Sequence, residues 1–234
     1  MQKIKVLTGV RVAQSSGIAQ VAFSFLDFVE KGNSNINVVA VDMINSDKES
    51  YKKIEDKKTS VISIKTKLPN IGKIVNESKN LKQVKQKYEK IIKLYQKAIK
   101  EEKPDLILIN GTYFMPWCLL IASERENIPA VLHYHGVLSK EVQNWKKPQR
   151  KIFLAMERCF DKKDLFYIFP SKITKNIVEK EVFCHKIKKY SILANPVSGH
   201  FFTEKIRRKL IFAKNWLNII IKKVQNLLLM LLQI

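Results

Sequence analysis

Short apolar runs that stop abruptly at small or polar residues are the main pattern along this chain of 234 residues. The clearest runs lie at residues 104–111, 129–136 and 165–171. Strands of a parallel sheet read as continuous apolar runs, because helices cover both of their faces. Similar runs, which we also predict to be strands, occupy residues 3–10, 37–43, 60–65 and 190–194.

Segments with helical spacing alternate with these strands. Residues 80–102 place apolar side chains three and four positions apart, which predicts a long amphipathic helix. Further helices are predicted at residues 18–31, 115–126, 148–160 and 172–181. Polar connections are predicted at residues 48–58 and 66–79. Repeated strand–helix units imply a parallel sheet with right-handed crossovers. The sequence therefore predicts an α/β protein with a Rossmann-like parallel sheet and helices on both faces.

The carboxyl ends of the predicted strands carry the candidate site, because ligands of such sheets bind just beyond those ends. Asn110-Gly111, His135-Gly136 and Ser171 would share one rim. A neutral imidazole at His135 could hydrogen-bond a sugar hydroxyl or a phosphate, since its pKa lies near physiological pH. The alternative is ordinary turn and cap chemistry, with Ser171 as the N-cap of the next helix.

Two further features are weaker candidates for a ligand site. His133 and His135 are two apart on a predicted strand and would point the same way, but no third metal ligand lies nearby in sequence. We therefore predict no metal site and expect His133 to be a hydrogen-bonded core residue. Ser16-Gly17 lies in the turn before the first helix, whose N-terminus could bind phosphate. That turn is neither a dinucleotide fingerprint nor a P-loop, and a plain turn is the favoured reading.

The charge of +22 is unusual, and 37 of the 43 basic residues are lysines. Specific nucleic-acid recognition favours arginine, so no specific nucleic-acid partner is predicted. A lysine-rich surface is attracted to an anionic membrane, although the codon bias of an AT-rich genome would explain the composition equally well. Three scattered cysteines suggest reduced thiols, and no apolar tract is long enough to span a bilayer. We expect a cytoplasmic protein that can lie peripherally at the inner face of the membrane.

The composition changes after Glu204. Residues 205–234 contain seven basic residues but no acidic residue, glycine or proline. Such a segment could form a basic amphipathic helix in a membrane interface. It could equally be an unstructured extension, or the product of a frameshifted or prematurely ended reading frame. We expect one domain over residues 1–204 and a separate tail over residues 205–234.

Four motifs follow one another within residues 1–202. They are QSSGIAQVAFSFL at residues 14–26, KPDLILING at 103–111, IPAVLHYHG at 128–136, and FPS at 169–171 with ILANPV at 192–197. Their order and spacing resemble the N-terminal domain of family 4 glycosyltransferases, which are retaining enzymes of the GT-B fold. Ser16-Gly17 stands where the family often has two glycines.

The resemblance implies an acceptor-binding domain that faces a nucleotide-sugar domain across a cleft. It implies hexosyl transfer to a lipid-linked or polysaccharide acceptor in envelope or capsule synthesis, without a metal. By resemblance, Ser16 and Gly17 would border the diphosphate and acceptor, His135 would face the transferred sugar as the catalytic residue, and Ser171 would lie on the cleft side.

Nothing in the chain resembles the nucleotide-sugar domain of that family. We therefore expect only the acceptor-binding half, inactive alone, with no cofactor of its own, and with another chain as the source of the missing domain. The alternative from a different class is a non-catalytic module that binds a membrane surface through its basic face and C-terminal tail.

Overall fold

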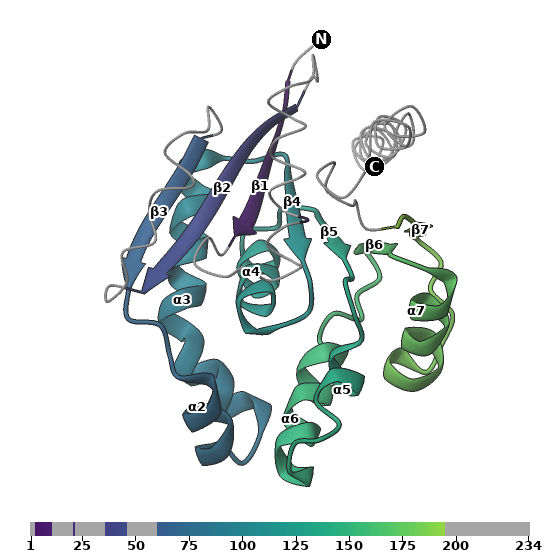
Figure 1. Ribbon diagram of the computed structural model, residues 1–234. Helices are drawn as coiled ribbons and strands as arrows, with labels where there is room; N and C mark the ends of the chain where they lie inside the picture. Colours follow the sequence, from purple (N-terminus) through teal and green to yellow (C-terminus); the bar gives the residue numbers. More distant parts are fainter. Residues whose placement is uncertain (1–2, 11–20, 22–35, 46–59, 195–234) are drawn as a thin grey trace, which may run out of the picture. The chain divides into compact units, whose positions relative to one another are not determined.

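The computed structural model describes residues 3–10, 21, 36–45 and 60–194. These residues contribute seven strands to one parallel sheet with the order β3-β2-β1-β4-β5-β6-β7 (Figure 1). The strands are β1 (Ile4–Val10), β2 (Ile36–Asn45), β3 (Ser60–Thr66), β4 (Leu106–Asn110), β5 (Ala130–His133), β6 (Phe166–Phe169) and β7 (Tyr190–Ile192). All of them lie in one compact unit, Met1–Ala194. The predicted Rossmann-like α/β fold is confirmed.

Successive strands are added to one side of β1 as far as β3 and to the other side from β4 onward, so the switch point lies between β1 and β4. The chain runs outward from β1 to β3 and then returns to place β4 beside β1, with Val6 opposite Leu106 and Thr8 opposite Leu108. Ligands of doubly wound sheets bind at such a switch point. Of the predicted helix at residues 18–31 the structure describes only Val21, and Ser16, Gly17 and the tail at residues 205–234 lie outside the described residues.

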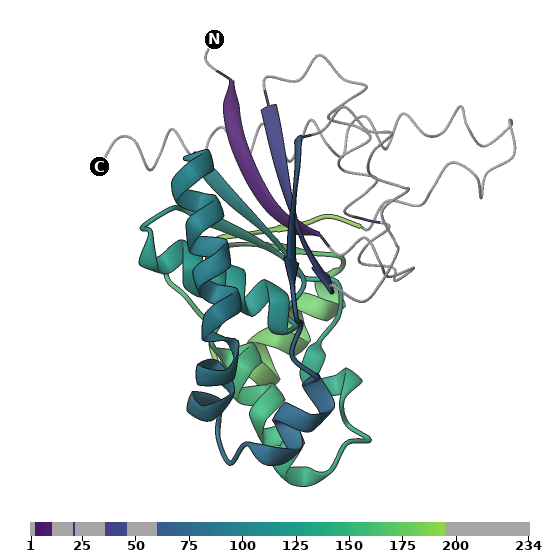
Figure 2. The same ribbon diagram turned by 90° about the vertical axis from the view of Figure 1, so that its left-hand side faces the viewer.

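The helices between β3 and β7 lie on one side of the sheet (Figure 2). This arrangement is expected, because right-handed crossovers that move along the sheet in one direction put their helices on the same face. The helices are α2 (Ile71–Glu77), α3 (Leu81–Glu102), α4 (Phe114–Arg125), α5 (Leu138–Glu141), α6 (Lys147–Arg158) and α7 (Lys172–Ile177), with a π-helical turn η2 (Val178–Phe183) after α7.

Three details differ from the prediction. The segment predicted as a polar connection at residues 66–79 contains α2, which Asn70 caps by accepting a hydrogen bond from the Lys73 N–H at 3.0 Å. The short helix α5 was not predicted, because one turn is too short to show a helical period. The helix predicted at residues 172–181 is α-helical only as far as Ile177, and a π-helical turn follows it.

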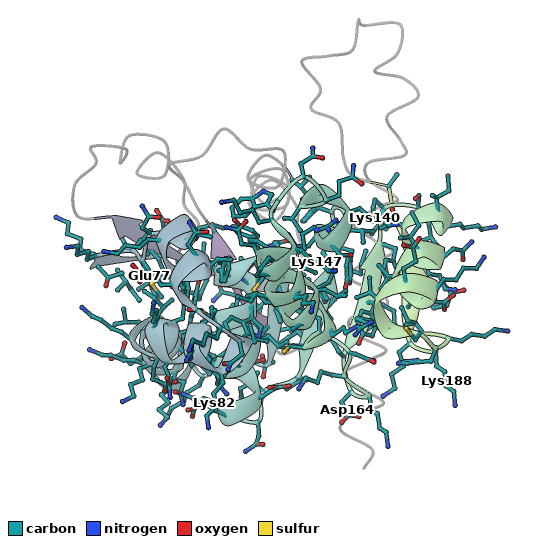
Figure 3. All side chains as sticks on the ribbon, turned by 90° about the horizontal axis from the view of Figure 1, so that it is seen from below. Glu77, Lys82, Lys140, Lys147, Asp164 and Lys188 are labelled. Atoms are coloured by element: carbon teal, nitrogen blue, oxygen red, sulfur yellow. The ribbon has the colours of Figure 1, made fainter. Side chains whose placement is uncertain are left out.

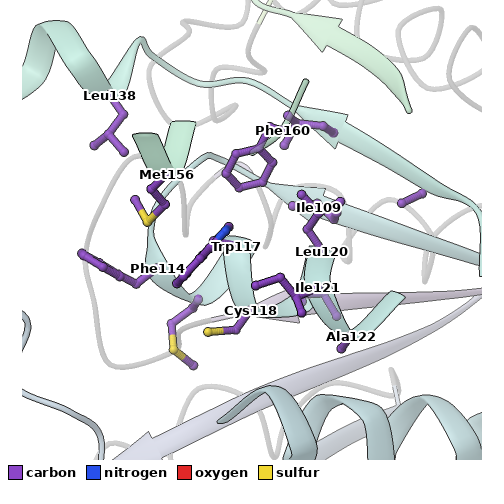
Figure 4. Close-up of a cluster of buried hydrophobic side chains, with 14 of the residues drawn as sticks. Ile109, Phe114, Trp117, Cys118, Leu120, Ile121, Ala122, Leu138, Met156 and Phe160 are labelled. Atoms are coloured by element: carbon purple, nitrogen blue, oxygen red, sulfur yellow. The ribbon is translucent and has the colours of Figure 1, made fainter. Parts of the chain in front are cut away.

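The core lies between the sheet and the layer formed by α3, α4 and α6. Every residue of β4 and β5 is buried, and nine residues of α4 are buried because the sheet and α3 enclose it. Aromatic rings connect the three helices: Tyr88 stacks on Phe114 with centroids 5.1 Å apart, and Phe114 meets Phe153 edge-to-face at 5.6 Å. Trp117 is 2% exposed and lies within this cluster (Figure 4).

Candidate functional site

Backbone hydrogen bonds align the carboxyl ends of four neighbouring strands. The Gly111 N–H donates to the His133 carbonyl at 2.8 Å, which joins the end of β4 to the end of β5. The Tyr134 N–H donates to the Ile168 carbonyl at 2.8 Å, and the Leu193 N–H donates to the Phe169 carbonyl at 2.7 Å. The segments that follow these strands therefore leave the sheet along one edge, which we call the rim.

The rim brings together the described residues that were predicted from sequence as site residues. They are Asn110, Gly111, His135, Gly136 and Ser171. Ser16 and Gly17 belong to the same prediction but lie outside the described residues. The roles of all seven in ligand binding remain predictions.

Asn110 holds the switch point together. Its side chain is 8% exposed, and its amide donates to the Thr8 hydroxyl at 2.8 Å. That hydroxyl in turn donates to the Leu108 carbonyl at 2.8 Å, so a polar chain crosses from β4 to β1 and back. Gly111 follows with φ of 81°, a left-handed conformation that favours glycine and turns the chain into the loop before α4.

His133 and His135 form a contacting pair although only His133 lies on β5. Their ring centroids are 4.3 Å apart, with an angle of 47° between the planes. His133 is 3% exposed, and burial holds its pKa well below the usual value; charge on His135 would lower that pKa further. The expectation that His133 is a core residue is confirmed. It is neutral at neutral pH, so His135 has an uncharged neighbour.

His135 itself lies two residues beyond the end of β5, on the rim. Its side chain is half-buried, and both ring nitrogens are shielded from solvent. The sequence prediction extended the strand to residue 135, whereas the strand ends at His133. The position of His135 beyond the strand end agrees with the place where ligands bind to such sheets.

Two glutamates that sequence reasoning missed lie against the loop after His135. A Cβ atom added at Gly136 would collide with Oε1 of Glu141, so this exposed carboxylate lies directly over the Gly136 backbone. No sequence pattern points to Glu141, because its contact with Gly136 arises only when Leu138–Glu141 form α5. It supplies a negative charge beside the His135-Gly136 turn.

Glu157 is the second of these glutamates, and it is completely buried. Its two carboxylate oxygens accept hydrogen bonds from the Leu138 and Ser139 N–H groups, each at 2.9 Å. Burial raises the pKa of Glu157, and these hydrogen bonds oppose the shift. A signal was present in the sequence, since Glu157 lies one helical turn after Phe153 on the apolar face of its helix.

Ser171 begins the helix that follows β6. Its hydroxyl accepts a hydrogen bond from the Thr174 N–H at 3.1 Å, so the predicted N-cap role is confirmed.

The described part of the chain holds neither a candidate metal cluster nor a helix able to span a membrane. Within residues 3–10, 21, 36–45 and 60–194, no three or more His, Cys, Asp or Glu side chains are grouped so that they could hold a metal ion. In the same residues no helix has the length and apolarity needed to cross a membrane.

Comparison with known proteins identifies the family. The model of Glycosyltransferase Family 4 matches residues 78–198, just over half of the chain. The chain belongs to glycosyltransferase family 4. The matched region contains the ends of β4, β5 and β6, and therefore every rim residue that the structure describes. No curated protein shows a significant sequence match to this family 4 chain.

Solved structures share the fold at low sequence identity. Sucrose-phosphate synthase from Thermosynechococcus elongatus is 11% identical, with a TM-score of 0.58, over 88% of this chain and 52% of that one. A glycosyltransferase from Rickettsia africae ESF-5 is 14% identical, with a TM-score of 0.52, over 92% and 50%. UDP-GlcNAc 2-epimerase from Neisseria meningitidis, bound to UDP-GlcNAc, is 15% identical, with a TM-score of 0.52, over 82% and 47%. The family 4 chain thus spans about half the length of these structures.

Proposed function

We propose that residues 1–234 provide the acceptor-binding side of a glycosyltransferase. The reaction would transfer a hexosyl group from a nucleotide-sugar to a lipid-linked or polysaccharide acceptor in envelope or capsule synthesis. The observation that carries this proposal is the family match, which spans the strand ends where His135 and the other described rim residues gather.

The proposed chemistry centres on His135. Its imidazole lies beyond the strand end and beside His133. Because His133 is neutral, it places no positive charge next to the His135 ring. An uncharged imidazole can donate one hydrogen bond and accept another, which suits a sugar hydroxyl or a phosphate oxygen. In this proposal His135 faces the transferred sugar, and Gly136 lets the chain turn close to it.

The remaining rim residues would bind and position the acceptor. Asn110 is held by Thr8, and Ser171 is held by its own helix, so both occupy defined positions before any ligand arrives. A preorganised site loses less conformational freedom on binding. Ser16 and Gly17 would complete the acceptor side at the end of β1.

We propose that residues 1–234 alone do not catalyse efficient transfer. Most of the acceleration in such a reaction comes from preorganised charges that stabilise the departing diphosphate. In the two-domain arrangement implied by the family resemblance, the opposite domain binds the nucleotide-sugar and supplies those charges. We place the reaction in the cytoplasm, at the inner membrane face, where a lipid-linked acceptor would be presented.

The experiment measures acceptor binding and sugar transfer separately, with purified protein of 234 residues. The probes are a short-chain polyprenyl-diphosphate sugar in detergent micelles and a set of UDP-hexoses. We expect the lipid-linked sugar to bind, and His135→Ala to weaken that binding by about 10-fold, the value of one good hydrogen bond to a charged group. The matched control is His185→Ala, which removes an exposed imidazole paired with Asp161.

The outcomes distinguish the parts of the proposal. Binding of UDP-hexoses in preference to the lipid-linked sugar would contradict the acceptor assignment. Equal effects of His135→Ala and His185→Ala would contradict the role of His135. Multiple turnovers of any UDP-hexose by the purified chain would show that these residues need no second domain.

A further inference from the structure

An exposed indole projects from the connection between α5 and α6. Trp145 is 37% exposed and is one of three large hydrophobic side chains that are exposed among the described residues. Its ring packs edge-to-face on the fully buried Phe153 at 5.1 Å, and the backbone N–H of the same residue donates to the Val142 carbonyl at 3.0 Å. The indole is therefore held in a fixed position with part of its surface in water.

Four basic side chains lie next to this indole in the sequence, and all four are exposed. They are Lys146, Lys147, Arg150 and Lys151, which together with Trp145 we call the α6 patch. Within the described part of the chain, no acidic side chain forms an ion pair with any of them. By contrast, Lys140, Lys162 and Lys175 each pair with a glutamate.

The α6 patch is firmly attached to the domain. Arg150 donates to the Gln143 carbonyl at 3.3 Å, and the Lys146 N–H donates to the Gln149 side chain at 3.1 Å. Gln149 also hydrogen-bonds to Asn76 of α2. A partner that binds the patch would therefore bind the folded domain rather than a loose loop.

We propose that the α6 patch docks the protein on an anionic phospholipid surface. Tryptophan favours the boundary between lipid headgroups and acyl chains, where its ring is buried and its N–H remains hydrated. Lysine and arginine keep their charged ends among anionic headgroups while their aliphatic parts lie against apolar surface. Each basic residue near such a surface adds to the attraction.

Other partners fit the α6 patch less well. Lysine is depleted from the interfaces of protein complexes, yet three of the four basic residues here are lysines. Proteins that bind single-stranded nucleic acid stack successive bases on several aromatic rings, whereas the patch has one exposed aromatic ring. The combination of one fixed indole and several unpaired cations fits a lipid surface best.

The α6 patch lies at the same end of the sheet as the rim. The connection from β5 leaves the carboxyl end of that strand, and α6 starts there and runs back toward the amino end of β6. Figure 3 views this end of the domain and labels Lys147 at the start of α6, with Lys140 of α5 nearby. Docking through the patch would turn the end of the domain that carries His135 toward the lipid. The docking itself does not rest on the proposed sugar transfer.

The experiment measures partitioning of the full 234-residue protein onto vesicles of phosphatidylglycerol and phosphatidylcholine, with phosphatidylcholine alone as the reference. The variants are Trp145→Ala and the double variant Lys146→Gln/Lys147→Gln. The matched control is Lys163→Gln/Lys188→Gln, which removes the same charge from exposed positions ahead of β6 and β7. We expect binding to require the anionic lipid and to weaken with salt. Binding should fall about 10-fold or more in the patch double variant, and less than about 2-fold in the control double variant.

A second measurement reports the indole directly. Lipids brominated in the acyl chain quench tryptophan fluorescence on contact, and Trp145→Phe should remove a large part of that quenching while Trp117→Phe, at a buried indole, leaves it. Equal losses in the patch and control double variants would overturn the proposal, as would unchanged quenching in Trp145→Phe. A different outcome would point to a general polyanion site and overturn the proposal. In that case Lys146→Gln/Lys147→Gln would weaken binding to homopolymeric RNA and to vesicles equally, and Trp145→Ala would affect neither.

Discussion

Glu157 and Leu138 are joined by a buried hydrogen bond of 2.9 Å from the Leu138 N–H to a carboxylate oxygen. The second oxygen binds the Ser139 N–H at the same distance, so one side chain of α6 satisfies two N–H groups at the start of α5. These groups lie directly after the His135-Gly136 turn. Glu157 therefore determines how the chain leaves the rim.

The first prediction concerns this buried carboxylate. Glu157→Ala should lower the free energy of unfolding by about 3 kcal/mol, because two buried N–H groups lose their partner and a cavity remains. Glu157→Gln keeps one acceptor oxygen and should lose less. Urea unfolding measures both, and hydrogen exchange should show faster exchange at Leu138 and Ser139. Glu181→Gln, at an exposed glutamate, should cost less than about 1 kcal/mol; an equal loss there would contradict the assigned role.

The second prediction concerns the pH dependence of stability that His133 imposes. Its pKa is lowered in the folded state, so below about pH 6.5 the unfolded chain binds a proton that the folded protein does not. Stability should therefore fall as the pH drops, by up to about 1.4 kcal/mol per pH unit from this group. Urea unfolding between about pH 7.5 and pH 5.5 measures the slope, which His133→Gln should reduce. An unchanged slope in the variant would show that other groups cause the acid sensitivity.

The third prediction concerns the polar chain across the switch point. Thr8→Val removes the hydroxyl that accepts from Asn110 and donates to the Leu108 carbonyl, so two buried polar groups lose a partner. The expected loss of stability is about 2 kcal/mol. In an Asn110→Ala background the same change should cost about 1 kcal/mol less, because the shared bond is already gone. Strictly additive losses in this double-mutant cycle would refute the coupling.

The fourth prediction contrasts two rim glycines. Gly111→Ala should cost about 1–2 kcal/mol, because the backbone has φ of 81°, where a Cβ atom is strained. Gly136→Ala meets only the end of the exposed Glu141 side chain, which can move aside, so its cost should be less than about 1 kcal/mol. Thermal unfolding of both variants measures the contrast. Adding Glu141→Ala should relieve the Gly136→Ala cost and leave the Gly111→Ala cost unchanged.

The parallel sheet was predictable because its central strands β4 and β5 are buried at every position. Residues 104–111 read as one apolar run, and β4 is indeed buried at all five positions from Leu106 to Asn110. The helix predicted at residues 80–102 was also correct to within one residue, since α3 is long enough for its period to show. Elements of one or two turns, such as α5, carry too few residues for a periodic signal.

The sequence by itself determined the order of strands and helices, the chemistry available at the strand ends, and the family. These follow from local patterns: apolar runs, helical spacing and short motifs. Only the tertiary structure decided which distant residues meet: Asn110 with Thr8 across 102 positions, and Glu157 with Leu138 across 19. Such contacts depend on how distant elements pack, and burial in that packing determines the charge state of His133.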